Sequence, residues 1–122
     1  MKNINRWLKL AQGIRIIGLL FVLSAGLFLI PQTAQALTFT TFDAPGSTFT
    51  LPHGINSSGQ IVGFFLDSTG GHGFLRDKKG SFTTIDVPGS LGTNATGINS
   101  SGQIVGVFGD STGAVRGFLA TP

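Results

Sequence analysis

The feature that most constrains the fold of this chain is a tandem duplication with a period of 43 residues. The ten residues Gly54–Gly63 (GINSSGQIVG) return unchanged at Gly97–Gly106. Over the first 34 aligned positions of the two units, 23 pairs are identical. The units, residues 37–79 and 80–122, account for everything after residue 36. Repeats of this length are typical of proteins in which each unit buries its apolar surface against its neighbours.

The turn sequences within a unit predict four short strands and no helix. Pro-Gly, Ser-Ser-Gly and Asp-Ser-Thr-Gly turns separate segments rich in β-branched and aromatic residues. In the second unit the predicted strands are Ser81–Val87, Gly97–Asn99, Gln103–Phe108 and Arg116–Ala120. Four strands in each 43-residue unit match one blade of a β-propeller, in which sheets stack face to face. We therefore expect an all-β fold of two tandem four-stranded propeller-like blades, with a small β-sandwich as the alternative.

The strand that follows each Ser-Ser-Gly turn carries apolar residues on both faces. In the first unit Ile61 and Phe65 point one way, and Val62 and Phe64 point the other. A strand of this kind needs cover on both sides. Two blades alone leave two sheet faces bare, so we expect self-association or contact with neighbouring repeats. Two or three copies closing a ring of four or six blades would fall within the roughly 4–8 blades usual for propellers. A sandwich would achieve the cover within one chain.

The repeated block resembles the bacterial extracellular repeats called the HAF family, after a His-Ala-Phe tripeptide. The resemblance rests on G-I-N-x-x-G-Q-I-V-G followed by an x-G-F-L strand, and it covers both units. The tripeptide positions hold His72-Gly73-Phe74 and Arg116-Gly117-Phe118, so Gly replaces the Ala in both units and Arg replaces the His in the second. The resemblance implies an exported, propeller-like repeat protein with no established biochemical activity, and it supplies no catalytic residues.

Residues 1–36 have the three parts of a secretory signal peptide. The cations end at Arg15, the apolar stretch Ile16–Ile30 follows, and Ala34 and Ala36 form an A-x-A cleavage site. The alternative is an uncleaved membrane anchor, but fifteen apolar residues fall short of the roughly 20 that span a bilayer. We expect a helical signal peptide, cleavage after Ala36, a secreted, periplasmic or cell-surface location, and no membrane contact after cleavage.

Charge and cysteine content exclude several functions. The formal net charge is +3, but four of the eight cations lie in the first fifteen residues. After residue 36, four cations stand against five aspartates. A near-neutral body cannot neutralise a row of phosphates, so nucleic acid is not an expected partner. The absence of cysteine removes disulfides, thiol catalysis and thiolate metal sites.

Differences between the two units indicate where a specific site would lie. Identical positions are those that the fold needs twice, whereas a binding site is usually needed once. The unmatched positions fall mainly in residues 48–53 and 91–96, with others near 71–72 and 114–116. The candidate ligand-binding residues in these segments are Phe49, His53, His72, Asn94 and Arg116.

Each chemically suggestive group also has a plainer structural interpretation. Asp67 and Asp110, in the Asp-Ser-Thr-Gly loops, are weak candidates for Ca²⁺ binding, because one carboxylate per loop is few for roughly six to eight ligands. An Asp-capped turn is the favoured interpretation. His53 and His72 would need help from an aspartate to hold zinc. The serines lack a G-x-S-x-G elbow. We expect no catalytic residue, no resident metal and no cofactor.

Together these patterns predict an exported β-repeat module that binds an unidentified ligand or serves as a structural unit. Such a module could be a piece of a longer propeller. The alternative is a small secreted hydrolase or metal-binding protein that uses the non-repeated loops. An enzyme should show polar residues that converge in a pocket of one unit only. A module should present a surface built from both units.

The leader generates a first testable prediction. N-terminal sequencing of the exported protein should return Leu37, because signal peptidase cleaves after a small residue such as Ala36. Recovery of Met1 from exported material would contradict cleavage. The substitution Ala36→Leu is the control, and it should leave the leader attached.

Overall fold

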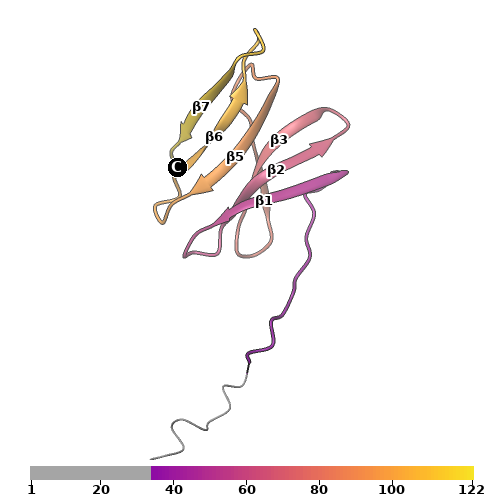
Figure 1. Cartoon of the computed structure of the whole chain (residues 1–122), viewed down its shortest axis with the longest axis vertical. Helices are drawn as coiled ribbons and strands as arrows, with labels where there is room; N and C mark the ends of the chain where they lie inside the picture. The colour runs from indigo at the N-terminus through magenta and orange to yellow at the C-terminus, as the bar shows by residue number, and fades with distance from the viewer. Residues whose placement is uncertain (1–33) are drawn as a thin grey trace, which may run out of the picture. The chain divides into compact units, whose positions relative to one another are not determined.

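The computed structural model describes residues 34–122 and contains seven strands in two antiparallel sheets (Figure 1). All seven strands belong to one compact unit, Thr40–Pro122. Sheet 1 consists, in spatial order, of β1 (Phe49–Ile55), β2 (Ile61–Asp67), β3 (Gly70–Arg76) and β4 (Phe82–Ile85). Sheet 2 consists of β5 (Gly92–Ile98), β6 (Ile104–Gly109) and β7 (Val115–Ala120). The all-β fold class is confirmed.

The described residues form no helix, and so none that is long and apolar enough to cross a membrane. The predicted signal peptide lies, up to residue 33, outside the described residues.

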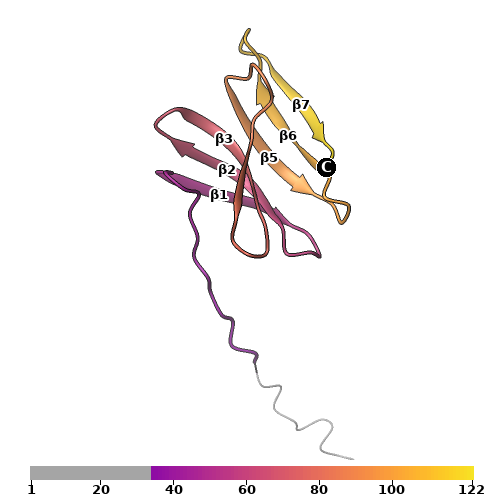
Figure 2. The ribbon, with the colours of Figure 1, turned by 180° about the vertical axis from the view of Figure 1, so that it is seen from behind.

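The fourth strand of sheet 1 comes from the second sequence unit. β4 pairs with β3 because the turn between them is tight: the Asp77 carboxylate accepts the backbone N–H groups of Lys79 and Ser81, at 2.8 and 2.9 Å. Gly80 closes this turn with φ +95°. The chain then crosses to the other sheet (Figure 2). We expected the strand Ser81–Val87 to open a second four-stranded sheet, and this is wrong, because the observed strand β4 completes sheet 1 and leaves sheet 2 with three strands among the described residues.

β5 is longer than the sequence indicates. The predicted strand Gly97–Asn99 is only the end of a seven-residue strand that begins at Gly92. The added residues pair with β6, and a β-bulge lies between Ala95 and Gly97. Pairing with β6 makes these residues a strand, although their apolar and polar side chains do not alternate along the sequence.

The unchanged ten-residue block builds the β1–β2 and β5–β6 turns. Asn56 Oδ1 accepts the backbone N–H groups of Ser58 at 3.1 Å and Gln60 at 3.0 Å. Asn99 repeats both bonds one unit later. A glycine with positive φ completes each turn, a conformation that residues with a Cβ rarely adopt. The turns therefore explain why this block is identical in the two units.

Sheet 1 buries apolar side chains on both of its faces, as the sequence predicts. Val62 is fully buried between the sheets, and Phe65 is buried on the opposite face. The inter-sheet cluster consists of Val62, Leu75, Ile85, Ala95, Ile98, Ile104, Phe118 and Ala120. The outer cluster consists of Phe42, Ala44, Ile61, Phe65, Phe74 and Phe82.

The two sheets contact each other through faces that are not equivalent. Sheet 1 uses the face of Val62, which we call the front. Sheet 2 uses the face of Ile104, whose counterpart Ile61 lies in the outer cluster; we call this face the back. Phe118 and its counterpart Phe74 are divided between the clusters in the same way. The contact is therefore heterologous, because the front of one sheet meets the back of the next.

This arrangement predicts that substitution of Gly73 and substitution of its counterpart Gly117 have different effects on stability. A Cβ on Gly73 would lie 2.8 Å from the carbonyl oxygen of Ile85 in β4. A Cβ on the counterpart Gly117 meets only the Gly106 carbonyl, at 3.8 Å, because no strand of the described residues lies on the outer side of β7. Gly73→Ala should lower the free energy of unfolding by about 1–3 kcal/mol, the usual cost of overpacking.

The matched variant Gly117→Ala should leave the free energy of unfolding of a single chain nearly unchanged. Urea unfolding followed by circular dichroism at the lowest workable protein concentration measures both variants. Equal losses in the two would contradict the assignment of β4 to sheet 1.

Candidate functional site

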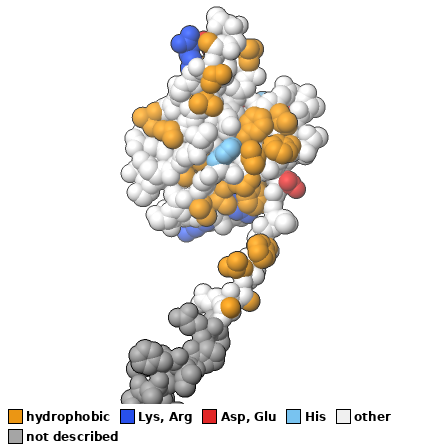
Figure 3. Space-filling model, in the orientation of Figure 1, with side chains coloured by type: hydrophobic (Ala, Val, Ile, Leu, Met, Phe, Trp, Pro, Cys, Tyr) orange, Lys and Arg blue, Asp and Glu red, His pale blue; other side chains and the backbone are white. Residues whose placement is uncertain are grey.

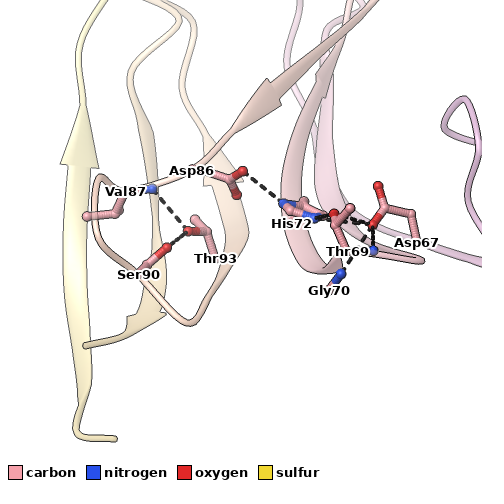
Figure 4. A network of polar contacts seen from close by, with 8 residues as sticks. All are labelled: Asp67, Thr69, Gly70, His72, Asp86, Val87, Ser90 and Thr93. Atoms are coloured by element: carbon pink, nitrogen blue, oxygen red, sulfur yellow. Dashed lines mark hydrogen bonds and ion pairs between the residues drawn. The ribbon is translucent and has the colours of Figure 1, made fainter. Parts of the chain in front are cut away.

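The most connected group of titratable side chains in the described part of the chain surrounds His72 (Figure 4). His72 lies on β3. The β2–β3 turn holds Asp67 and Thr69 on one side of the ring, and Asp86 follows β4 on the other. The short hairpin at Asp77 is what carries Asp86 to the ring, because it sets β4 beside β3.

Both ring nitrogens of His72 have partners. Nδ1 lies 2.8 Å from Asp86 Oδ2, and Nε2 lies 2.8 Å from Thr69 Oγ1 and 3.4 Å from Asp67 Oδ1. The Thr69 hydroxyl donates to Asp67 Oδ1 at 2.6 Å. A protonated ring donates from both nitrogens, to Asp86 and to Thr69, and so satisfies the whole chain of hydrogen bonds.

The neighbouring carboxylates raise the pKa of His72 above its ordinary value of 6.5. The largest cause is the hydrogen bond to Asp86; attraction to Asp86 and Asp67 adds to it, and partial burial opposes it. The pKa of Asp67 is lowered, chiefly by the hydroxyl of Thr69. The network therefore stabilises the cationic form of the ring.

The second unit contains the same turn with arginine in place of histidine. Asp110 Oδ1 accepts the backbone N–H of Thr112 at 2.9 Å as well as its hydroxyl, and Arg116 Nε donates to Asp110 Oδ2. The Thr112 hydroxyl first and Arg116 second lower the pKa of Asp110 to about 2. The turn-capping interpretation of Asp67 and Asp110 is confirmed.

The network around His72 does not present a nucleophile. A Thr–His–Asp line serves covalent catalysis when the imidazole takes the proton of the hydroxyl. Here the Thr69 hydroxyl donates to Asp67, and the raised pKa of His72 favours the ring that has no lone pair to accept a proton. Within residues 34–122, no group of three or more His, Asp or Glu side chains is arranged to hold a metal ion. The arrangement suits an ion-paired turn that anchors the end of β4.

A hollow of about 250 Å³ adjoins the network and is lined by residues 69–72 and 86–92. Its wall is braced by Thr93, whose hydroxyl accepts the Val87 N–H at 3.0 Å. Thr50 accepts the Ala44 N–H at 3.1 Å in the first unit. The wall of the hollow is therefore part of the repeated fold.

The structure does not gather the candidate residues into one site. Phe49 and His53 lie on β1, Asn94 on β5 and Arg116 on β7, whereas His72 lies on β3. Phe49 is half-exposed beside Phe64, with 6.5 Å between the ring centroids. His53 is exposed, and Asn94 Oδ1 is buried without a hydrogen-bond partner. No hydrogen bond or ion pair of the described residues joins two of the five candidates.

Sequence reasoning missed Asp86 and Thr69 as partners of His72. Both are identical in the two units and are therefore attributed to the fold alone. A usable signal exists in the sequence, because the unmatched His72 and Arg116 occupy equivalent positions and are both basic. Two different cations at one repeated position point to a repeated acidic partner.

Comparison of the chain with protein-family models, with curated proteins and with solved structures found no match. The resemblance to HAF repeats therefore stays a prediction that rests on the repeated residues themselves.

The raised pKa of His72 predicts a pH-dependent stability. A group whose pKa is raised by folding stabilises the folded state fully below its unfolded value, here near 6.5, and this contribution is lost as the pH rises through the folded value. The free energy of unfolding should therefore fall as the pH rises above 6.5. Urea unfolding at a series of pH values measures the effect.

Two variants identify the group responsible. His72→Arg installs the permanent cation of the second unit and should abolish the fall. His53→Gln changes an exposed histidine that takes part in none of the described hydrogen bonds, and it should preserve the fall. A fall that persists in His72→Arg would assign the titration to another residue.

Proposed function

We propose that the chain is an exported module of the β-propeller type, which acts through contacts between stacked repeat sheets and not through catalysis. The heterologous contact between the sheets is the observation that carries this proposal. Each sheet offers its back to the sheet before it and its front to the sheet after it, so the same contact can be repeated. A sandwich packed through equivalent faces would leave no such pair of unlike ends.

A polar contact between the units supports the same conclusion. Asn56 Nδ2 donates to the carbonyl oxygen of Asn99 at 3.0 Å, and these residues are equivalent, 43 positions apart. Both side-chain amides also donate to the glutamine of their own unit at 2.8 Å, but among the described residues only Asn56 donates across to the other unit. The innermost strands also approach closely, since a Cβ on Gly54 would lie 3.7 Å from the Cα of its counterpart Gly97. One-directional contact between equivalent residues is what stacking of successive units produces.

The polar groups support a structural role. The same Asp-Ser-Thr-Gly turn binds a histidine in one unit and an arginine in the other, so the position requires a cation and not a proton carrier. A general base could not be exchanged in this way, because arginine does not release its proton. The hydrogen bonds of both turns are explained by the fold.

The character of the surface also supports contact with another sheet. Hydrophobic side chains are exposed over both sheets, with few charged groups between them (Figure 3). Exposed apolar patches mark surfaces that associate with a partner. The leader, read as a signal peptide, supports a location outside the cytoplasm for these contacts.

Addition of a third unit tests the proposal. A copy of residues 80–122 fused after Pro122 should pack on the front of sheet 2 and raise the free energy of unfolding by about 3 kcal/mol or more, the gain from burying two large aliphatic side chains. The body contains neither Trp nor Tyr, so circular dichroism follows the unfolding. The matched control is the same extended chain with Val105→Asp, which places a charge on the front of sheet 2. Independent unfolding of the added unit would contradict a stacked-repeat module.

A further inference from the structure

Sheet 2 lacks the strand that completes sheet 1. β3 has β4 on its outer side, whereas its counterpart β7 has no strand on that side within the described residues. The first three residues of β4 recur as residues 39–41, and these belong to no strand. We propose that residues 39–42 of a second copy of this chain form the fourth strand of sheet 2, antiparallel to β7. The inference rests on the proposed function, to which it adds the identity of the partner.

The pairing of β3 with β4 gives the register. Its pairs run from Gly73↔Ile85 to Arg76↔Phe82. Replacing each residue by its counterpart in the other unit gives the pairs between β7 and the second copy: Gly117↔Phe42, Phe118↔Thr41, Leu119↔Thr40 and Ala120↔Phe39.

Apolar side chains on the front of sheet 2 need the cover that a second copy supplies. Val62 is fully buried on the front of sheet 1, but its counterpart Val105 is 49% exposed. Leu75 packs in the inter-sheet cluster, but its counterpart Leu119 is 62% exposed. The back of sheet 1 has the complementary gap, where Ile55 is 67% exposed. The front of sheet 2 in one copy can therefore pack on the back of sheet 1 in the other, as the front of sheet 1 packs on the back of sheet 2 within one chain.

Phe42 already occupies the position that this contact requires. Its ring lies on the outer cluster, 6.4 Å from the ring of Phe74, with the guanidinium carbon of Arg76 4.8 Å from its centroid. Its counterpart Ile85 lies in the inter-sheet cluster, against the back of sheet 2, while it forms part of β4. By the same relation, Phe42 lies where the last residue of the outermost strand of a preceding sheet would lie.

The charges along the proposed junction are complementary. In sheet 1 the strand pairing brings Asp86 within 2.8 Å of His72. The same pairing brings Asp43 of the second copy to Arg116, whose side chain is 61% exposed and binds Asp110 through one nitrogen. The guanidinium has five N–H donors and can hold both carboxylates.

One chain cannot supply this strand to itself. Phe42 packs on the back of sheet 1, and sheet 1 meets sheet 2 through its front. The segment therefore belongs to a sheet that would precede sheet 1. In a second copy, the front of sheet 2 needs cover and the edge of β7 needs a strand, and the first copy can supply both. A heterologous contact closes into a ring when the rotation between successive copies adds up to a full turn, and rings of two to four copies would contain the roughly 4–8 sheets of closed propellers.

Cysteine cross-linking tests the pairing, because the chain has no cysteine of its own. Thr40→Cys and Leu119→Cys are exported as separate variants, mixed and oxidised. The proposed register sets these residues opposite each other on adjacent strands, within reach of a disulfide. The mixture should form the disulfide at least about tenfold faster than either variant alone, because only the mixture contains directly opposed cysteines. The equivalent pair within one chain, Leu75→Cys with Thr83→Cys, is the positive control.

Sedimentation equilibrium provides an independent test. The exported protein should sediment as a multiple of the chain mass. Gly117→Ala should weaken association at least about tenfold, because its methyl group meets the carbonyl of residue 42 as a Cβ on Gly73 would meet that of Ile85. Gly109→Ala is the matched control, since its counterpart is the larger Leu66.

The outcomes separate this inference from the proposed function. A folded monomer at micromolar concentration overturns the inference, and so does a mixture that cross-links no faster than the single variants. If that monomer is still stabilised by a fused third unit, the repeat module stands and the second copy is not its partner. If the third unit adds no stability either, both proposals fail.

Discussion

The hydrogen-bonded pairing of β3 with β4 is the interaction on which the rest of the structure depends. It takes a strand from the second sequence unit and uses it to complete the sheet of the first. From β4 the chain continues through Pro88 and Gly89 into β5, so the same pairing fixes the start of sheet 2 against the front of sheet 1. It also carries Asp86 to His72. Topology, core and polar network thus follow from one short hairpin.

The direction of stacking has a chemical basis in the two faces of each sheet. Gly63 leaves room for the ring of Phe74 to lie directly on β2, because a Cβ there would come within 2.8 Å of that ring. Gly106 and Phe118 repeat this packing in sheet 2, at 2.6 Å. The back is therefore dense and aromatic, whereas the part of the front of sheet 1 that contacts sheet 2 carries the aliphatic side chains Val62, Leu75 and Ile85. Faces that differ in shape and composition do not pair with copies of themselves, and this gives the contact its direction.

The sequence predicts the period of the repeat, the all-β class, the need for cover on both strand faces and the Asp-capped turns. It does not predict the phase of the repeat, because any window of 43 residues is an equally valid unit until the hydrogen-bond partners are known. For this reason the sequence prediction assigns β4 to the wrong sheet. The link between His72 and Asp86 spans 14 residues and depends on the β3–β4 register, so composition alone does not reveal it. The extent of β5 depends in the same way on its partner strand.

The edges of the sheets differ in how they are protected against further pairing. β1 carries Pro52, which has no N–H to donate, and a bulge follows it; β5 has a bulge at the same point. β4 is only four residues long, and short edge strands offer few free groups. β7 has neither a bulge in its pairing with β6 nor a proline, and it exposes Leu119 where a protected edge strand usually places lysine. Its one charged side chain, Arg116, is bound to Asp110. Within the described residues the edge of β7 is therefore open, as the proposed pairing with residues 39–42 of a second copy requires.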